Sequence, residues 1–342
     1  MLDDLKYIHE KDGQDALGIA EKQWQQLEHE FDLPELNFNP KNIVFAGMGG
    51  SALAALLATS WPGFKIPFEI SRDYKIPAYT SGDTLFIASS YSGNTEETLE
   101  SLSYAEEAGA HIVVIASGGK LAEIAKNKNY PLALLPQVSQ PRYALLYGFK
   151  ALLSILEKVG ITSVSNDNNE LNEAIDALKS ATANWRPDVP TSDNYAKQLA
   201  YDIIGKSAVV YGGPLTYPAA YKWKISFNEI AKNVAWVNQY PEFNHNEFIG
   251  WTSHPIDKPY AVIDLKSSFE HPRVIKRFEL SAKLLSGRRP APIVVSAQGK
   301  TLLDHLLWLI ALGDFVTLYV ALLNGLNPTP VELIEKFKKE LA

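Results

Sequence analysis

The stretch 43–60, IVFAGMGGSALAALLATS, passes from a short apolar run through glycines into a helical pattern. The same order recurs where apolar residues 84–88 lead into the hydroxyl-rich segment 89–95, and where apolar residues 112–115 lead into residues 117–119. Short apolar runs that alternate with helices of about 12 residues are typical of βαβ units. Uninterrupted apolar runs are typical of parallel strands that are covered on both faces. The first half of the chain therefore predicts a doubly wound parallel sheet.

The second half restarts the same pattern. The apolar run 208–211 meets Gly212 and Gly213, and further strand candidates follow at 234–237, 260–263 and 293–295. A strand that ends in glycines thus opens both halves, which favours two copies of one three-layer α/β/α unit. We expect a first domain with an N-terminal helix over residues 1–155, a helical connection over 156–190 and a second domain over 191–342.

The overall composition is that of an ordinary water-soluble protein. A chain of 342 residues is expected to form about two domains, at roughly 100–200 residues per domain. Lys and Arg number 32 and Asp and Glu number 39, so the net charge is −7, which disfavours nucleic acid as the main partner. The chain has no cysteine, which excludes disulfides, zinc–thiolate sites and cysteine nucleophiles.

Neither the N-terminus nor the most apolar stretch favours a membrane. The first 15 residues, MLDDLKYIHEKDGQD, are polar and acidic and have no apolar core of a signal peptide. The stretch 302–323 is interrupted by Asp304, His305 and Asp314, so it reads as a buried core helix rather than a membrane span. We expect a cytoplasmic protein that does not bind a membrane.

The glycine-rich turn 47–52, GMGGSA, admits three interpretations. It fits G-x-G-x-x-A, and Glu69 follows at the distance of a dinucleotide-binding acidic residue. It also fits a turn in which Gly49, Gly50 and Ser51 bring backbone N–H groups at a helix start to a phosphate or sugar. The third interpretation is tight strand–helix packing without a ligand.

The segment 89–98, SSYSGNTEET, favours the phosphate interpretation. Ser90, Ser92 and Thr95 surround a glycine at the predicted start of a helix. Hydroxyls and free amides donate to phosphate oxygens, and the helix dipole favours the negative charge. The competing interpretation is an N-cap, in which a hydroxyl followed by glutamates forms a capping box. Capping explains one hydroxyl and one glutamate, whereas a phosphate site uses the whole set.

Glu229 and His245 are the candidates for acid–base chemistry. Glu229 closes a predicted helix and His245 follows beyond the next strand, so both are expected near the carboxyl edge of the second sheet. The competing interpretation is that both are solvated surface residues, as most charged side chains in loops are. No motif requires a metal. His245-Asn246-Glu247 has no cysteines to complete a deaminase zinc site, and Gly299-Lys300-Thr301 has no upstream P-loop glycine.

These segments together resemble the bifunctional phosphoglucose/phosphomannose isomerase family of the sugar isomerase (SIS) group. The resemblance runs in one order from about residue 40 to 341, through segments 47–52, 90–98, 141–142, 228–229, 241–247 and 327–331 and Lys338. It implies two SIS domains with an active site between them, a homodimer with shared sites, and metal-free isomerisation of glucose 6-phosphate and mannose 6-phosphate to fructose 6-phosphate through a cis-enediol, without a cofactor.

The resemblance also implies a role for each matched residue. Gly49, Gly50, Ser51, Ser90, Ser92 and Thr95 would bind the substrate, mainly through its phosphate. Arg142 would stabilise the enediolate, and Glu229 would move the proton between carbons 1 and 2. His245 of the partner subunit would assist ring opening together with Lys338, although Lys339 is adjacent and the assignment could shift by one.

Two other functions are compatible with parts of the sequence. A non-catalytic SIS-type sensor of sugar phosphates would need residues 90–95 but not Glu229 and His245, and no DNA-binding helix pair precedes the first domain. An NAD(P)-dependent dehydrogenase would use residues 47–52 and Glu69 but would leave the hydroxyl-rich segment unexplained.

Overall fold

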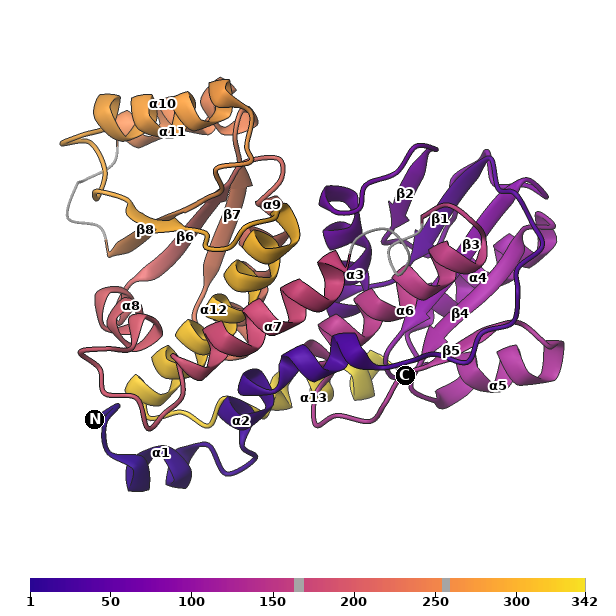
Figure 1. Ribbon diagram of the computed structural model, residues 1–342, viewed down its shortest axis with the longest axis horizontal. Helices are drawn as coiled ribbons and strands as arrows, with labels where there is room; N and C mark the ends of the chain where they lie inside the picture. The colour runs from indigo at the N-terminus through magenta and orange to yellow at the C-terminus, as the bar shows by residue number, and fades with distance from the viewer. Residues whose placement is uncertain (163–168, 254–258, 342) are drawn as a thin grey trace. The chain divides into compact units, whose positions relative to one another are not determined.

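The structure is a computed structural model that describes residues 1–162, 169–253 and 259–341, with the side chains of residues 338, 339 and 341 excepted. Contacts between residues divide the chain into two compact units. One unit is Gln23–Ile175, and the other combines Met1–Lys22 with Asp176–Ala342. Each unit contains its own parallel sheet with helices on both faces, as the sequence predicts (Figure 1).

The unit Gln23–Ile175 is built on five parallel strands in the order β2-β1-β3-β4-β5. They are β1 (Asn42–Ala46), β2 (Phe68–Ser71), β3 (Thr84–Ser90), β4 (His111–Ala116) and β5 (Leu132–Leu134). The three predicted strands are confirmed as β1, β3 and β4, which form the buried centre of the sheet. The sequence analysis missed β2 and β5, because these edge strands are short and less completely buried.

Helices cover both faces of this first sheet. On one face, α4 (Glu96–Glu107) and α5 (Gly119–Lys128) pack on a core that includes Val44, Phe86 and Val114. On the other face lie α3 (Gly49–Ser60) and α6 (Leu145–Lys158), which pack against each other (Figure 1). The remaining elements are η1 (Gln23–Glu28), η2 (Pro141–Tyr143) and the beginning of α7 (Glu170–Ala183). Because every connection is a crossover, both β1 and β3 end at the edge from which α3 and α4 begin.

The other unit has four parallel strands in the order β7-β6-β8-β9. They are β6 (Ser207–Gly212), β7 (Ala235–Gln239), β8 (Tyr260–Lys266) and β9 (Ile293–Ser296), and all four match predicted strands. One face carries η3 (Glu242–His245), α10 (Glu247–Gly250), η4 (Trp251–Ser253) and α11 (Pro272–Leu284); the other carries α8 (Tyr195–Ile203), α9 (Tyr217–Glu229) and α12 (Leu302–Leu323) (Figure 1). Helix α13 (Glu332–Leu341) follows α12.

Helix α12 forms the centre of this unit. It is long and apolar enough to cross a membrane by length and composition, but 89% of its apolar window is buried inside the protein. A buried helix that is apolar on nearly all sides is typical of a core element. The predicted core helix is therefore confirmed. Its start is fixed by a capping box, in which the Thr301 side chain accepts from Asp304 N and the Asp304 carboxylate accepts from Thr301 N.

The first residues of the chain pack into this second unit. Helices α1 (Leu5–Lys11) and α2 (Ala16–Glu21) belong to it, and the Tyr7 hydroxyl donates to Leu322 O at 2.6 Å. The buried Lys197 Nζ lies 3.0 Å from Asp3 Oδ1 and donates to the carbonyls of Pro187 and Val189. Residues 1–22 thus join the second unit, whereas the sequence analysis placed them with the first, because their apolar side chains are buried there.

A buried ion pair joins α9 to α12. Lys222 Nζ donates to Asp314 Oδ1, and Ser226 Oγ lies 2.8 Å from the same ammonium and 3.0 Å from the same carboxylate oxygen. Lys222 is 1% exposed and Asp314 is 6% exposed. Charges at this depth need a partner because water no longer solvates them. The cluster therefore fixes α9, the helix that carries Glu229, against the core helix.

The first prediction concerns this cluster. Asp314→Ala leaves the Lys222 ammonium buried without its carboxylate, and we expect the free energy of unfolding to fall by about 3–5 kcal/mol. The matched control is Glu279→Ala, which breaks the exposed ion pair of Glu279 with Lys276 and should cost about 0–1 kcal/mol. Urea denaturation measures both values, and losses of equal size would contradict a stabilising role for the cluster.

Candidate active site

The glycine-rich turn joins β1 to α3 and reaches the loop that follows β3. Gly49 has φ +49°, a left-handed conformation that glycine adopts without strain. Ser51 lies in the first turn of α3, and its Oγ accepts a hydrogen bond from Tyr91 N at 3.1 Å. Residues at the ends of β1 and β3 are therefore brought together, as expected for neighbouring parallel strands.

The hydroxyl-rich loop is tightly ordered around its glycine. Ser90 Oγ and Thr95 Oγ1 lie 2.8 Å apart, and Ser90 Oγ also accepts from Gly93 N at 3.1 Å. Gly93 has φ +70°, and a Cβ at this position would lie 1.8 Å from Gly118 O, so only glycine fits. Ser92 is exposed. The loop thus holds two hydroxyls next to each other and a third at the surface.

The capping interpretation of this loop is not what the structure shows. Thr95 is the N-cap residue of α4, yet its side chain makes no capping hydrogen bond to the helix. Its hydroxyl is directed to Ser90 instead. In α12, by contrast, Thr301 at the same position does cap the helix. The backbone N–H groups at the start of α4 are therefore not satisfied by Thr95, which favours an external anion there.

Arg142 lies in η2 and belongs to the same region of this unit. It is 3% exposed, its Nη1 donates to Gln140 Oε1 at 3.4 Å, and its guanidinium lies 4.9 Å from the centre of the Tyr143 ring. A Cβ built on Gly50 would be 3.8 Å from Arg142 Cα. The structure therefore brings the glycine turn next to both the hydroxyl loop and a buried arginine.

Glu69 does not occupy the position that a dinucleotide fingerprint requires. It lies inside β2, where it pairs in register with Val44, two residues before the end of β1. Its carboxylate accepts from the Tyr79 hydroxyl at 2.7 Å. The pKa of Tyr79 is raised to about 12, mainly by burial and in addition by this hydrogen bond to Glu69. These contacts give Glu69 a structural role and weaken the dehydrogenase interpretation.

Glu229 is the last residue of α9 and is half-buried in the second unit. Its neighbour Asn228 accepts from Ala235 N at 3.1 Å, which ties the end of α9 to the start of β7. Lys232 Nζ donates to Glu229 O at 2.8 Å and to Pro328 O at 2.9 Å. The segment that leads into α13 is thereby held next to the end of α9. Two of the segments that the resemblance singles out thus meet here.

His245 ends η3 and is exposed. The residues around it are fixed by several hydrogen bonds: Asn244 binds Ser281 Oγ at 2.9 Å and Arg277 Nη1 at 3.1 Å, and Asn246 Nδ2 donates to Glu242 at 2.6 Å. The imidazole is thus presented to the outside on an ordered turn. Lys338 lies in α13, and its side chain is outside the described part of the structure.

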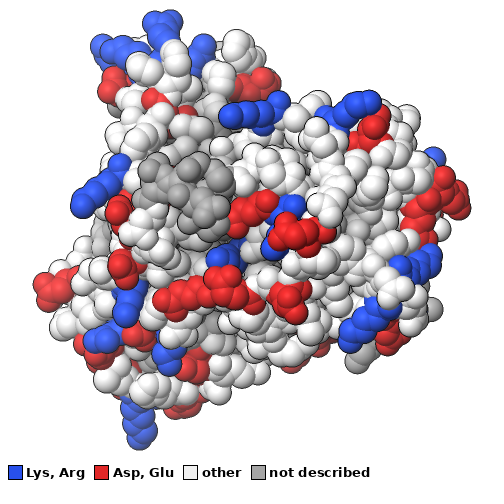
Figure 2. Space-filling model, turned by 45° about the vertical axis from the view of Figure 1, so that its right-hand side comes forward, with Lys and Arg blue, Asp and Glu red and all other residues white. Residues whose placement is uncertain are grey.

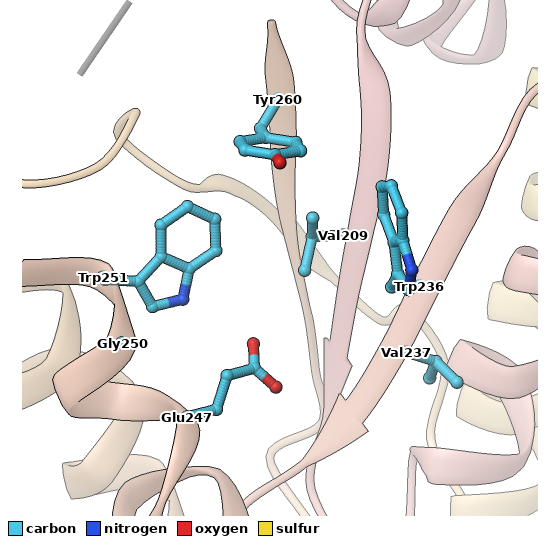
Figure 3. A pocket seen from close by; sticks show the side chains of 7 residues that line it. All are labelled: Val209, Trp236, Val237, Glu247, Gly250, Trp251 and Tyr260. Atoms are coloured by element: carbon cyan, nitrogen blue, oxygen red, sulfur yellow. The ribbon is translucent and has the colours of Figure 1, made fainter. Parts of the chain in front are cut away.

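A pocket of about 320 Å³ lies beside the His245 turn, within the second unit. Figure 3 shows the side chains of Trp236, Trp251 and Tyr260 around it, with the Glu247 carboxylate facing Val209. Glu247 accepts from the Tyr211 hydroxyl and from Asn238 Nδ2, so it anchors the turn. None of the predicted site residues whose side chains the structure describes lines this pocket.

Figure 2 shows how charged side chains are distributed over one face of the molecule. On the face in Figure 2, basic and acidic side chains are interspersed among the described residues and the basic ones form no continuous field. Nucleic-acid-binding surfaces concentrate lysine and arginine on one face. Within the first unit, the buried Arg142 supplies one positive charge beside the glycine-rich turn.

Several buried charged residues could not be found from the sequence, the Lys222–Asp314 pair and Glu270 among them. The Lys222–Asp314 pair was missed because the partner of Asp314 comes from a helix far away in sequence. Glu270, which is 4% exposed, was missed because its loop carries no recognised motif. The available signal for Glu270 was its position in the loop after a strand of the second half, where the first half has its hydroxyl-rich loop.

The second prediction tests the hydroxyl loop as an anion site. The double substitution Ser90→Ala with Thr95→Val should weaken the binding of inorganic phosphate about 10- to 100-fold, because hydrogen bonds to a charged group are worth about 1.5–3 kcal/mol. The control Thr301→Val removes the N-cap hydroxyl of α12 and should leave phosphate affinity unchanged, at a cost of about 1 kcal/mol in stability. Calorimetric titration gives the affinities; an unchanged affinity in the double variant would refute the assignment.

Comparison with known proteins identifies both units. Residues 38–158 match the SIS domain, and residues 192–341 match the bacterial phospho-glucose isomerase C-terminal SIS domain. The chain is 36% identical to the bifunctional phosphoglucose/phosphomannose isomerase of Caldicellulosiruptor bescii, over 88% of this chain and 89% of that protein. The protein of the same name from Aquifex aeolicus is 34% identical, over 88% of this chain and 90% of its own length.

A solved structure shares the fold. The crystal structure of a glucose-6-phosphate isomerase like protein from Thermus thermophilus superposes with a TM-score of 0.67 and 20% identity, over 99% of this chain and 98% of that one. The two domain matches and the identity over nearly the full length of the relatives show the family. The chain belongs to the bifunctional phosphoglucose/phosphomannose isomerase family.

Proposed function

We propose that the protein interconverts glucose 6-phosphate, mannose 6-phosphate and fructose 6-phosphate through a cis-enediol intermediate. The observation that carries the proposal is the convergence of Ser51, the hydroxyl loop and the buried Arg142 at one region of the first domain. Family membership supports the same activity, because the relatives of this length are named for it. Phosphate binding would use Gly49, Gly50, Ser51, Ser90, Ser92 and Thr95.

Glu229 is proposed as the base. In the open-chain aldose its carboxylate removes the proton from C2, the electron pair forms the C1–C2 double bond of the enediol, and the same carboxyl group returns a proton to C1 to give the ketose. The hydroxyl proton of O2 moves to O1, so no oxidant or reductant is consumed. Glu229 stands at the end of a helix whose last turn is tied to β7 through Asn228, which suits a base that must keep its position.

Arg142 is proposed to stabilise the enediolate. Negative charge develops on the oxygens of C1 and C2 as the proton leaves, and a fixed cation lowers the energy of that state. A guanidinium remains charged even when it is buried, whereas a lysine in the same place could lose its proton. The 3% exposure of Arg142 and its contact with Tyr143 hold it in one orientation.

Ring opening is proposed to use His245 and Lys338. Sugar phosphates are cyclic in water, so a proton must leave O1 and another must reach the ring oxygen before isomerisation begins. A second copy of the chain would contribute the exposed His245 to the site, so the proposed active form is a homodimer. We further propose a cytoplasmic enzyme of sugar-phosphate metabolism that needs neither metal nor cofactor and binds neither nucleic acid nor a membrane.

The third prediction concerns the base. Glu229→Gln keeps the size of the side chain but cannot accept the proton, so turnover of fructose 6-phosphate should fall about 10²- to 10⁴-fold. Phosphate affinity should be unchanged, because the phosphate is bound by the other domain. The matched control Glu279→Gln, on the exposed face of α11, should retain full turnover.

Two outcomes would contradict the proposed role of Glu229. Turnover close to normal in Glu229→Gln would exclude it as the base. If Glu229→Gln kept its turnover at saturating substrate and lost only phosphate affinity, Glu229 would have a role in binding rather than in proton transfer. A non-catalytic sensor predicts no turnover in the parent protein.

The fourth prediction concerns the range of substrates and the need for a metal ion. One purified preparation should convert both glucose 6-phosphate and mannose 6-phosphate, and Glu229→Gln should reduce both activities by the same factor, because one base serves both epimers. Both activities should survive a chelator such as EDTA. A coupled assay measures them; loss of both in EDTA would favour a metal-dependent isomerase, and unequal loss in the variant would require a second base.

A further inference from the structure

The second domain repeats the chain path of the first around its carboxyl edge. Strand β6 lies between β7 and β8 as β1 lies between β2 and β3. Five residues, 91–95, separate β3 from α4, and five residues, 267–271, separate β8 from α11. Aligned from the strand ends, Glu270 of the second loop corresponds to Asn94 of the first. The two loops thus have the same length and the same place in two copies of one fold.

Glu270 is directed at the start of α9. Its Oε1 accepts from Leu215 N at 2.9 Å and from Thr216 N at 3.0 Å, and it lies 3.3 Å from Thr216 Oγ1. Leu215 and Thr216 immediately precede the first residue of α9. The side chain is 4% exposed. A carboxylate thus binds the amides of the two residues that precede α9, where the positive potential of the helix N-terminus favours an anion.

The neighbouring glycine leaves room for this carboxylate. A Cβ built on Gly213 would lie 2.3 Å from Glu270 Oε1. Gly213 has no positive φ, so its backbone conformation would accept alanine and only the space is lacking. A side chain at 213 would therefore displace the end of Glu270. Gly213 is thus needed for the carboxylate to reach the amides of residues 215 and 216.

The corresponding loop of the first domain is arranged differently. The loop of the first domain contacts α3 through the Tyr91 amide, which donates to Ser51 Oγ. Asn94, in the position of Glu270, is a neutral amide and is exposed. Its Nδ2 donates to Ser92 O at 3.2 Å and its Oδ1 accepts from Lys120 N at 3.1 Å. The first loop thus carries hydroxyls, of which that of Ser92 is on an exposed residue, whereas the second loop turns a carboxylate inward.

We infer that Glu270 is a built-in anion that closes the second domain's copy of the phosphate site, so that each chain binds one sugar phosphate, in the first domain. This rests on the proposed function of the loop 90–95. Carboxylate and phosphate oxygens accept the same hydrogen bonds, so one replaces the other at a helix N-terminus. Burial raises the pKa of Glu270, and its hydrogen bonds from residues 215 and 216 act in the opposite direction.

The experiment counts inorganic phosphate sites per chain by equilibrium dialysis on the full-length protein. The parent protein should bind one phosphate, and Glu270→Ala should bind a second. Glu270→Ser, which also removes the carboxylate but keeps a small polar side chain, should gain the second site as well and covers the case in which Glu270→Ala fails to fold. Glu270→Gln fills the same space without charge and should stay at one site. Two sites in the parent, or one site in both Glu270→Ala and Glu270→Ser, would overturn the inference.

A second background separates this inference from the proposed function. In the Ser90→Ala, Thr95→Val protein, the first site should be weakened about 10- to 100-fold, and adding Glu270→Ala should restore one site per chain. If the hydroxyl loop does not bind phosphate, the double substitution will not change the parent's count, while Glu270→Ala still adds one site. If only the inference is wrong, the double substitution will remove the parent's site and Glu270→Ala will not restore one.

Discussion

The free amides at helix N-termini along the carboxyl edges of the two parallel sheets are the constraint on which the molecule's chemistry depends. In each domain, parallel strands end at one edge and the following helices start there, with backbone N–H groups that have no partner within the helix. These groups require an acceptor, preferably an anion. In the first domain, Thr95 does not cap α4 and the loop around it is lined with hydroxyls. In the second, Glu270 supplies a carboxylate to the residues before α9.

This difference divides the work between two copies of one fold. The first domain is proposed to hold the phosphate and, through Arg142, the charge that develops during proton transfer. The second domain is proposed to contribute the ends of its elements: Glu229 at the end of α9 and His245 on the turn after β7. It is held together by buried polar contacts, among them the Lys222–Asp314 pair. A helix held in this way keeps a carboxylate at its end in one position, as proton transfer requires.

The sequence predicted the parts of the structure that depend on local pattern. The strands at 43–46, 84–88 and 112–115 were visible because buried parallel strands are continuous apolar runs, and the meeting of Ser51 with the loop after β3 follows from parallel topology. Other features depend on contacts that no local pattern records. Arg142 lies on a short 3-10 helix far from the loops in sequence, so only family resemblance pointed to it. Residues 1–22 joined the second unit because a long-range contact, that of Tyr7 with Leu322, decides their position.

The central claim is that one carboxylate carries a proton between C1 and C2. Isomerisation of fructose 6-phosphate in D₂O, followed by NMR of the products, tests it most directly. A proton held on Glu229 exchanges with solvent during part of the turnovers, so both glucose 6-phosphate and mannose 6-phosphate should carry deuterium at C2. Products that form at the normal rate with no deuterium at C2 would show transfer of hydrogen without exchange, as in a hydride shift, and would contradict the account.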